Sequence, residues 1–155
     1  MINCVVSAST MDDIKKLKEK LLLKGQEICK MSLQTKSKID KVSTKFLRDG
    51  LVLMTHGDSK LVEHVLLKAA IEKGVRFTLY VTEGQPNQIG IQLKERLEKA
   101  TSNIDVKLIL DSAIGVIIRE VDYVIMGAEA VLENGGIVNK MGTYSTALIA
   151  KEFNK

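Results

Sequence analysis

After Gly50 the sequence alternates between short apolar runs and longer amphipathic stretches, a pattern that few folds accommodate. The apolar runs occupy residues 51–54, 75–81, 104–110 and 121–126, and sequence of helical period separates each run from the next. Strand-sized apolar runs that alternate with amphipathic helices are typical of βαβ units, in which helices cover a parallel sheet on both faces. We therefore predict a Rossmann-like α/β domain with a doubly wound parallel sheet over residues 51–155.

The four predicted strands differ in how polar they are. Three of the runs are almost continuously apolar, which is typical of strands buried on both faces. The run at 75–81 instead contains Arg76, Thr78 and Tyr80 at alternate positions. We therefore expect this second strand to be half exposed.

Residues 1–50 form a predicted N-terminal helical segment. Thr10 and Asp13 have the spacing of a capping box, and apolar residues then follow at helical intervals, at Ile14, Leu17, Leu21 and Ile28. Gly25 weakens the pattern of a single unbroken helix, and the pair Asp49-Gly50 is a helix stop. The chain is thus predicted to divide into a helical segment, 1–50, and an α/β domain, 51–155.

The positive charge is concentrated in the N-terminal segment. Residues 14–50 contain 11 Lys and Arg against 4 Asp and Glu, whereas residues 51–155 contain 12 against 13. A basic helical surface can meet RNA, an acidic protein or a phosphorylated partner. Direct nucleic-acid binding is not expected, because the segment offers only Arg48 and Phe46 for bidentate phosphate contacts and base stacking.

Composition places the chain among soluble proteins. It has no apolar stretch of about 18 residues, and its first ten residues lack the pattern of a signal peptide. Its two cysteines, Cys4 and Cys29, form no disulfide framework, and there is no His/Cys cluster with metal-ligand spacing. We expect a cytoplasmic protein without membrane attachment, metal site or cofactor.

In a doubly wound sheet, functional side chains gather in the loops after the carboxyl ends of strands. These loops lie at residues 55–59, 82–87, 111–112 and 127–140. None contains G-x-G-x-x-G or G-x-x-x-x-G-K-[ST], so neither a dinucleotide site nor nucleotide hydrolysis is expected. The segments 134–136 and 139–143 allow two interpretations: a phosphate cradle at a helix start, or a tight turn followed by Thr143 as an ordinary N-cap.

The string GAEAVLENGGIVNKMGTYSTALIAKEFNK, residues 127–155, resembles the signature of a known superfamily. That superfamily contains the alpha, beta and delta subunits of translation initiation factor 2B and the isomerases of methylthioribose 1-phosphate and ribose 1,5-bisphosphate. The motifs VTEGQP at 81–86, LDSAIG at 110–115 and GAE at 127–129 are most similar to the alpha-subunit branch. The resemblance extends over residues 50–155.

The resemblance implies a non-catalytic regulatory and scaffold subunit of a guanine-nucleotide exchange complex. Implied partners are the other initiation factor 2B subunits, the phosphorylated alpha subunit of initiation factor 2, and a second copy in a homodimer of the full-length form. Three departures from the isomerases support this interpretation: Gly57 stands at the catalytic cysteine position, Glu129 replaces an aspartate, and Gln85 replaces a phosphate-binding arginine. No catalytic residue is therefore expected.

A sugar phosphate or nucleoside monophosphate is the expected regulatory ligand of the inherited pocket. The predicted pocket residues follow the four strands: His56, Gly57, Asp58, Glu83, Gln85, Asp111, Glu129, Asn139 and Lys140. Two of them have a second interpretation, because His56 suits a hydrogen bond within its loop and Asp111 suits a helix cap. Two other functions also stay open: an isomerase that uses Glu129 and Asp111 for proton transfer, and an RNA-binding protein that uses the basic helices.

The last predicted helix, residues 143–153, has no strand after it, although the final helix of an open α/β sheet normally leads into one. We therefore expect a sheet that is incomplete at its C-terminal side, in a chain truncated relative to its family. Such a chain should form a poor dimer with an unpaired strand edge.

Overall fold

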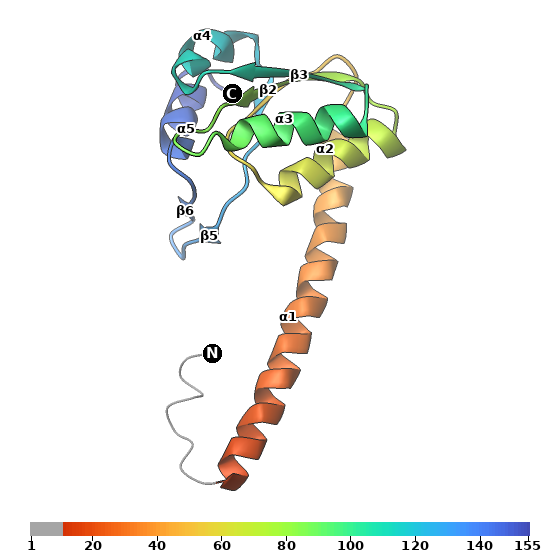
Figure 1. Ribbon diagram of the computed structural model, residues 1–155, viewed down its shortest axis with the longest axis vertical. Helices are drawn as coiled ribbons and strands as arrows, with labels where there is room; N and C mark the ends of the chain where they lie inside the picture. The colour runs from red at the N-terminus through yellow and green to blue at the C-terminus, as the bar shows by residue number, and fades with distance from the viewer. Residues whose placement is uncertain (1–10) are drawn as a thin grey trace. The chain divides into compact units, whose positions relative to one another are not determined.

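The computed structural model describes the backbone of residues 11–155 and the side chains of these residues except 11–13 and 44. Thr10 and Cys4, for which a helix cap and a free thiol were expected, lie outside the described residues. Figure 1 shows the elements, which follow the order α1 (Met11–Phe46), β1 (Val52–Thr55), α2 (Lys60–Glu72), β2 (Phe77–Thr82), α3 (Ile89–Ala100), β3 (Ile104–Ile109), η2 (Asp111–Ala113), α4 (Ile114–Ile117), η3 (Ile118–Glu120), β4 (Tyr123–Val124), β5 (Ala130–Val131), β6 (Ile137–Val138) and α5 (Thr143–Glu152).

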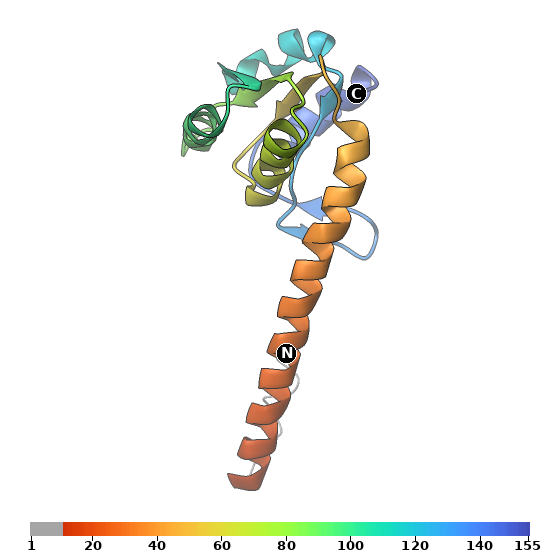
Figure 2. The same cartoon turned by 90° about the vertical axis from the view of Figure 1, so that its right-hand side faces the viewer.

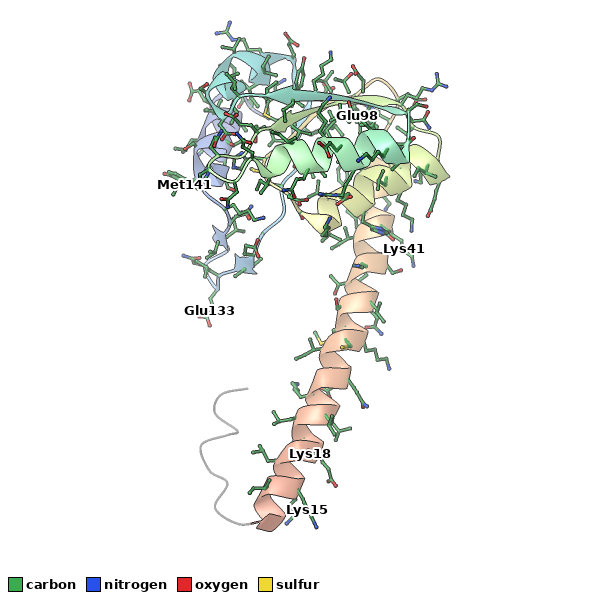
Figure 3. All side chains as sticks on the ribbon, viewed as in Figure 1. Lys15, Lys18, Lys41, Glu98, Glu133 and Met141 are labelled. Atoms are coloured by element: carbon green, nitrogen blue, oxygen red, sulfur yellow. The ribbon has the colours of Figure 1, made fainter. Side chains whose placement is uncertain are left out.

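The described part of the N-terminal segment contains one helix. Gly25 does not interrupt α1, which continues for 36 residues. The chain divides into two compact units, residues 1–41 and 42–155, so that the last turn of α1 belongs to the second unit. Lys15, Lys18 and Lys41 are among the basic residues of α1, as Figure 3 shows.

The α/β unit contains the predicted parallel sheet. Four strands pair in the order β3-β2-β1-β4, with Leu53 opposite Leu79 on one side and opposite Tyr123 on the other. Each crossover between neighbouring parallel strands runs through helical segments, as parallel pairing requires. Helices cover both faces of this sheet, with α2 and α3 on one face and α4 and α5 on the other (Figure 2). The predicted Rossmann-like layering is confirmed.

The expectation that the second strand is half exposed was wrong. Five of the six residues of β2 are buried, because β2 lies inside the sheet between β1 and β3. The polar side chain of Tyr80 is accommodated by a hydrogen bond of 2.9 Å that its hydroxyl donates to Glu120. The exposed strand is β3, which pairs only with β2 among the described strands and exposes Asp105, Lys107 and Leu108.

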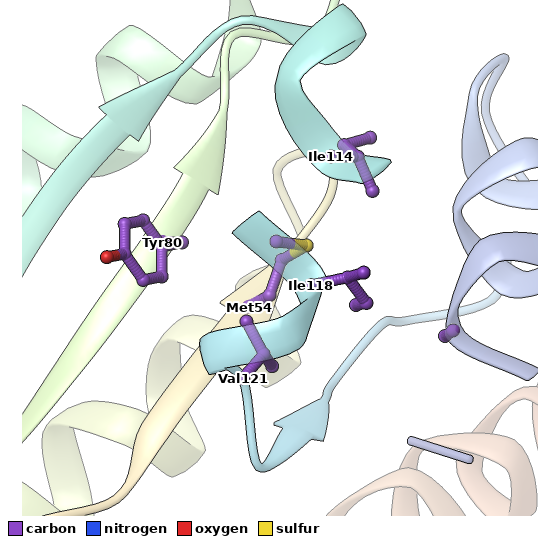
Figure 4. Close-up of a cluster of buried hydrophobic side chains, with 6 residues drawn as sticks. Met54, Tyr80, Ile114, Ile118 and Val121 are labelled. Carbon is purple, nitrogen blue, oxygen red and sulfur yellow. The ribbon is translucent and has the colours of Figure 1, made fainter. Parts of the chain in front are cut away.

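One core cluster fills the space between the sheet and the α4 side. It joins residues of β1, β2, the short helices and α5. Figure 4 draws its six buried members and labels five of them, Met54, Tyr80, Ile114, Ile118 and Val121; the sixth is Ala150. Side chains alternate between the two faces of a strand, so Leu53 and Leu79 lie on the opposite face, toward α2 and α3. The strand ends that hold the candidate site are thus fixed by packing on both faces.

A short antiparallel hairpin, β5–β6, interrupts the path from β4 to α5. Gly135 at φ +82° and the Asn134 side chain, which accepts from the Gly136 amide at 3.0 Å, close its turn beside Glu133 (Figure 3). The glycine pair therefore forms the turn of a hairpin, as the tight-turn interpretation of residues 134–136 expected.

Candidate functional site

The candidate site lies at the carboxyl ends of the strands, where the strand order changes direction. From β1 the chain adds β2 and then β3 on one side and returns to add β4 on the other, so the connections after β1 and β4 diverge. Such a switch point leaves a crevice outside the strand ends, which is where open α/β sheets bind ligands. The described cavities at this edge are lined by the loops that follow β1, β2 and β4 and by the segment before α5.

The first cavity has a volume of about 190 Å³. It brings together six of the nine predicted pocket residues with four residues that were not predicted to line a pocket. The lining residues are His56, Gly57, Asp58, Ser59, Lys60, Gly127, Ala128, Glu129, Asn139 and Lys140. Residues that are up to 84 positions apart in the sequence thus meet around one cavity at the edge of the sheet.

A second cavity of about 220 Å³ adjoins the first, since both are lined by His56 and Lys140. Of the other predicted residues it contains Gln85. The lining is completed by residues that sequence reasoning missed, namely Gly84, Pro86, Asn87, Ile89 and Met141. Neither cavity is lined by Glu83 or Asp111, so the structure does not bring these two to the cavity walls.

His56 is buried, with only 4% of its surface exposed, and both of its ring nitrogens have partners. Nε2 lies 2.6 Å from the carbonyl oxygen of Met141, and Nδ1 lies 2.6 Å from the Thr82 hydroxyl. A carbonyl oxygen can only accept, so Nε2 carries the hydrogen and, in the neutral ring, Nδ1 accepts from Thr82. His56 thus connects β2 with the segment before α5, and it lines both cavities. The alternative of a hydrogen bond within its own loop was wrong, because both partners of the ring lie in other segments.

The segment before α5 packs directly on the His56 ring. Gly142 has φ +91°, a conformation that L side chains rarely adopt, and a Cβ at this position would overlap the imidazole. Gly142 is also the residue that precedes the first turn of α5, so the prediction of Thr143 as an ordinary N-cap was wrong. Thr143 is buried instead, and its hydroxyl has no hydrogen-bond partner among the described residues.

Asp111 has a role that the sequence did not suggest. Its carboxylate accepts from the amides of Gly84 at 3.0 Å and Gln85 at 2.8 Å, so it holds the loop after β2 and does not cap the helix that it begins. Glu83 accepts from the Gln85 side chain at 3.3 Å in the same loop. These two carboxylates do not line the second cavity themselves, but they bind Gly84 and Gln85, which do.

Asp58, in the loop before α2, is neutralised by a residue of α3. Arg96 of α3 pairs with Asp58 and also with Glu63 of α2, through bonds of 2.9 and 3.0 Å to the latter. Burial tends to raise the pKa of Glu63, but the hydrogen bonds from Arg96 and Lys60 outweigh it and hold that pKa below its usual value. The hydrogen bonds of Arg96 with Glu63 and Asp58 in turn raise the pKa of Arg96. No local pattern marks Arg96, so sequence reasoning missed it.

The charges left facing the first cavity are an ammonium and a carboxylate. Among the described lining residues, Lys140 and Glu129 have no ion-pair partner, whereas Lys60 pairs with Glu63. Asn139 donates to the Gly127 carbonyl at 2.8 Å and thereby joins the loop after β4 to the segment that carries Lys140. A cavity with a free ammonium beside a free carboxylate suits a ligand that has both an anionic group and hydroxyls.

Gly57, at the position that the resemblance gives to the isomerase cysteine, has φ +86°. A Cβ there would meet Ile89 and Lys140 only at ordinary contact distance, so space does not require glycine at this position but the backbone conformation favours it. A loop built around glycine here supplies no thiol to the first cavity.

Residues 11–155 contain no group of three or more His, Cys, Asp or Glu residues placed to hold a metal ion. In the same range, no helix combines the length and the apolar character that crossing a bilayer demands.

Comparison with known proteins identifies relatives of two kinds. The family model described as the initiation factor 2 subunit family matches residues 1–155. Translation initiation factor eIF2B subunit alpha of Dictyostelium discoideum is 45% identical over 138 residues, which cover 89% of this chain and 42% of that protein. Ribose 1,5-bisphosphate isomerase of Archaeoglobus fulgidus is 33% identical over 141 residues, 91% of this chain and 44% of the enzyme.

A solved structure has the same fold. The crystal structure of the Pyrococcus horikoshii OT3 translation initiation factor eIF-2B matches with a TM-score of 0.71 at 29% identity, over 92% of this chain and 48% of that one. The chain therefore spans somewhat less than half the length of these relatives.

Proposed function

The chain belongs to the initiation factor 2 subunit family, and on that basis we propose that it acts as a non-catalytic regulatory subunit of an initiation factor 2B exchange complex. Its relative from Dictyostelium is named subunit alpha, and a subunit name implies an assembly with other chains. The proposed partners are other subunits of that factor, the phosphorylated alpha subunit of initiation factor 2, and a second copy of the full-length protein. The proposed location is the cytoplasm.

The observation that carries this proposal is the glycine at position 57. The resemblance implies that the isomerases carry a cysteine after the threonine-histidine pair at the end of β1, where this chain has Gly57 at φ +86°. A nucleophile or acid cannot be supplied from a residue that has no side chain. The second departure, Glu129 for aspartate, shifts a carboxylate by one methylene, and displacements of about 1 Å are costly in catalysis.

The isomerase relatives favour one competing function. The Archaeoglobus enzyme is 33% identical, and the first cavity offers Lys140 and Glu129 as an unpaired ammonium and carboxylate. An isomerase would use these groups to hold phosphate and to move a proton. This alternative predicts turnover of ribose 1,5-bisphosphate or methylthioribose 1-phosphate at rates on the order of 1 per second or more.

Two measurements decide between these functions. Purification of the tagged protein from its source should yield copurifying initiation factor 2B subunits, identified by mass spectrometry. The purified chain should show no turnover of either sugar phosphate. Turnover at enzyme-like rates that disappears in Glu129→Gln would refute the regulatory proposal.

We also propose that the cavities bind a sugar phosphate or a nucleoside monophosphate as a regulatory ligand, with Lys140 at the phosphate. The unpaired ammonium in a cavity at the switch point of the sheet supports this proposal. A ligand at 100 times its dissociation constant stabilises the folded protein by about 2.7 kcal/mol, which thermal melting detects. Lys140→Ala should abolish most of that stabilisation, and an unchanged shift would show that the phosphate lies elsewhere.

A further inference from the structure

His56 occupies the wall between the two cavities, yet it has little to offer a ligand. Both ring nitrogens are used, at 2.6 Å each, by the Met141 carbonyl and the Thr82 hydroxyl. The nearest carboxylate oxygen, on Asp111, lies 3.9 Å from Nδ1, beyond hydrogen-bond distance. Only carbon atoms of the ring are left to face the cavities, so a direct polar contact with a ligand would require one of these bonds to break.

The bond to Met141 restrains the residue that carries the free charge. Met141 follows Lys140 directly and is 84% exposed, and its main-chain carbonyl accepts the hydrogen bond from His56 (Figure 3). On the other side of that carbonyl, Gly142 packs against the imidazole without room for a Cβ. The His56 ring therefore restrains the backbone on the C-terminal side of Lys140 through a hydrogen bond and a close contact, in addition to the bonds that the Lys140 and Gly142 carbonyls accept from Thr143 and Thr146.

The restraint matters because Lys140 has no side-chain partner among the described residues. An exposed lysine side chain loses up to about 2 kcal/mol of rotamer freedom when it is ordered. A backbone that is fixed before the ligand arrives reduces the further cost of ordering on binding. A mobile backbone at residues 140–142 would add that cost to every binding event.

We propose that His56 is a positioning residue, which holds Lys140 at the wall of the two cavities through the Met141 carbonyl and does not bind the ligand through its own polar atoms. The expected effect on binding rests on the proposed phosphate ligand, whereas the role of His56 in holding the Met141 carbonyl does not depend on any ligand. The essential group is the Nε2 hydrogen, because it is the one that the ring donates to the segment before α5.

Two substitutions separate the two bonds of the ring. The side-chain amide of glutamine extends about as far from the backbone as Nε2, so His56→Gln retains a donor for the Met141 carbonyl. The shorter amide of asparagine matches Nδ1, so His56→Asn retains the contact with Thr82 and loses the contact with Met141. Both variants remove the imidazole and replace it with the same polar group, which makes them a matched pair.

The first readout needs no ligand. Amide hydrogen exchange in the 155-residue chain should be at least tenfold faster at Thr143 in His56→Asn than in the unmodified protein, and within about threefold of it in His56→Gln. Nitrogen chemical shifts of the unmodified His56 ring should show the neutral tautomer with hydrogen on Nε2. Hydrogen on Nδ1 alone would overturn the inference, since the Met141 carbonyl can only accept.

The second readout is the dissociation constant for ribose 5-phosphate, measured by titration calorimetry. His56→Asn should weaken binding by about tenfold, approaching the loss in Lys140→Ala, whereas His56→Gln should lose about threefold or less. Equal losses in the two His56 variants, or none in His56→Asn, would overturn the positioning role. If the unmodified chain binds neither ribose 5-phosphate nor adenosine monophosphate, the proposed ligand fails, and exchange and tautomer then decide the role of His56 alone.

Discussion

Replacement of Gly142 by alanine tests whether the contact between the α5 start and His56 is as close as the structure has it. Gly142 combines a φ of +91° with a Cβ position that falls on the imidazole. An L residue in the left-handed region costs about 1–2 kcal/mol. A methyl group forced into a packed site costs a further 1–3 kcal/mol or so. We expect Gly142→Ala to lower the free energy of unfolding by about 2–5 kcal/mol.

Gly135→Ala is the matched control, because the chain offers a second glycine of similar conformation without the contact. Gly135 has φ +82° in the β5–β6 turn, and a Cβ there would meet nothing within 4 Å. Its replacement should therefore cost only the conformational part, about 1–2 kcal/mol. The difference between the two variants measures the overlap with the His56 ring.

Urea unfolding followed by circular dichroism gives the free energies, and a double-mutant cycle isolates the contact. In a His56→Ala background, Gly142→Ala should cost no more than Gly135→Ala does, because the ring is absent. A coupling energy of about 1–3 kcal/mol is expected between positions 56 and 142. If Gly142→Ala costs the same as Gly135→Ala, or the same with and without His56, the close packing is refuted.

Three further predictions concern the ion pairs and the loop beside the cavities. The pKa of Glu63 lies below its usual 4.5, because the hydrogen bonds from Arg96 and Lys60 outweigh the effect of burial. The stability that ionised Glu63 contributes is therefore full above about pH 4.5 and is lost as the pH falls. The difference in unfolding free energy between the unmodified protein and Glu63→Gln should shrink from about pH 6 to about pH 3 in urea titrations. Arg96→Leu leaves Asp58 and Glu63 without their shared cation and should cost about 1–2 kcal/mol, less in 1 M salt, in thermal melts; a salt-independent loss would contradict an electrostatic cause. Asp111→Ala removes two hydrogen bonds from backbone amides and should cost about 1–3 kcal/mol, with Asp111→Asn costing less because one acceptor remains; equal costs would argue against those bonds.

The elements were largely predictable because their signals are local. Apolar runs of strand length and stretches of helical period placed four parallel strands and the helices between them to within a few residues. The short hairpin β5–β6 escaped because two-residue strands have no periodicity to detect. At Gly25 the sequence predicted a weak point that the structure does not show: glycine costs about 1 kcal/mol in a helix, yet α1 continues through it.

The composition of the site was partly predictable for a topological reason. Parallel strands end at a common edge, so polar residues after β1, β2 and β4 had to come near one another, and the family motifs at 127–143 marked the same edge. The partners of each residue were not predictable. Asp111 binds amides 26 and 27 positions away, and Arg96 of α3 pairs with Asp58, 38 positions earlier, separations over which sequence spacing carries no information.

The sequence by itself determined that this chain forms parallel strands alternating with helices, because periodicity and β-branched content act on the backbone residue by residue. It also determined that position 57 has no side chain to offer to chemistry. Only the tertiary structure decided which strand is central: Tyr80 is buried because β1 and β3 flank β2 and Glu120 satisfies its hydroxyl. Only the tertiary structure decided the role of His56, whose partners lie 26 and 85 positions away and meet because strand ends and helix starts converge at one edge of the sheet.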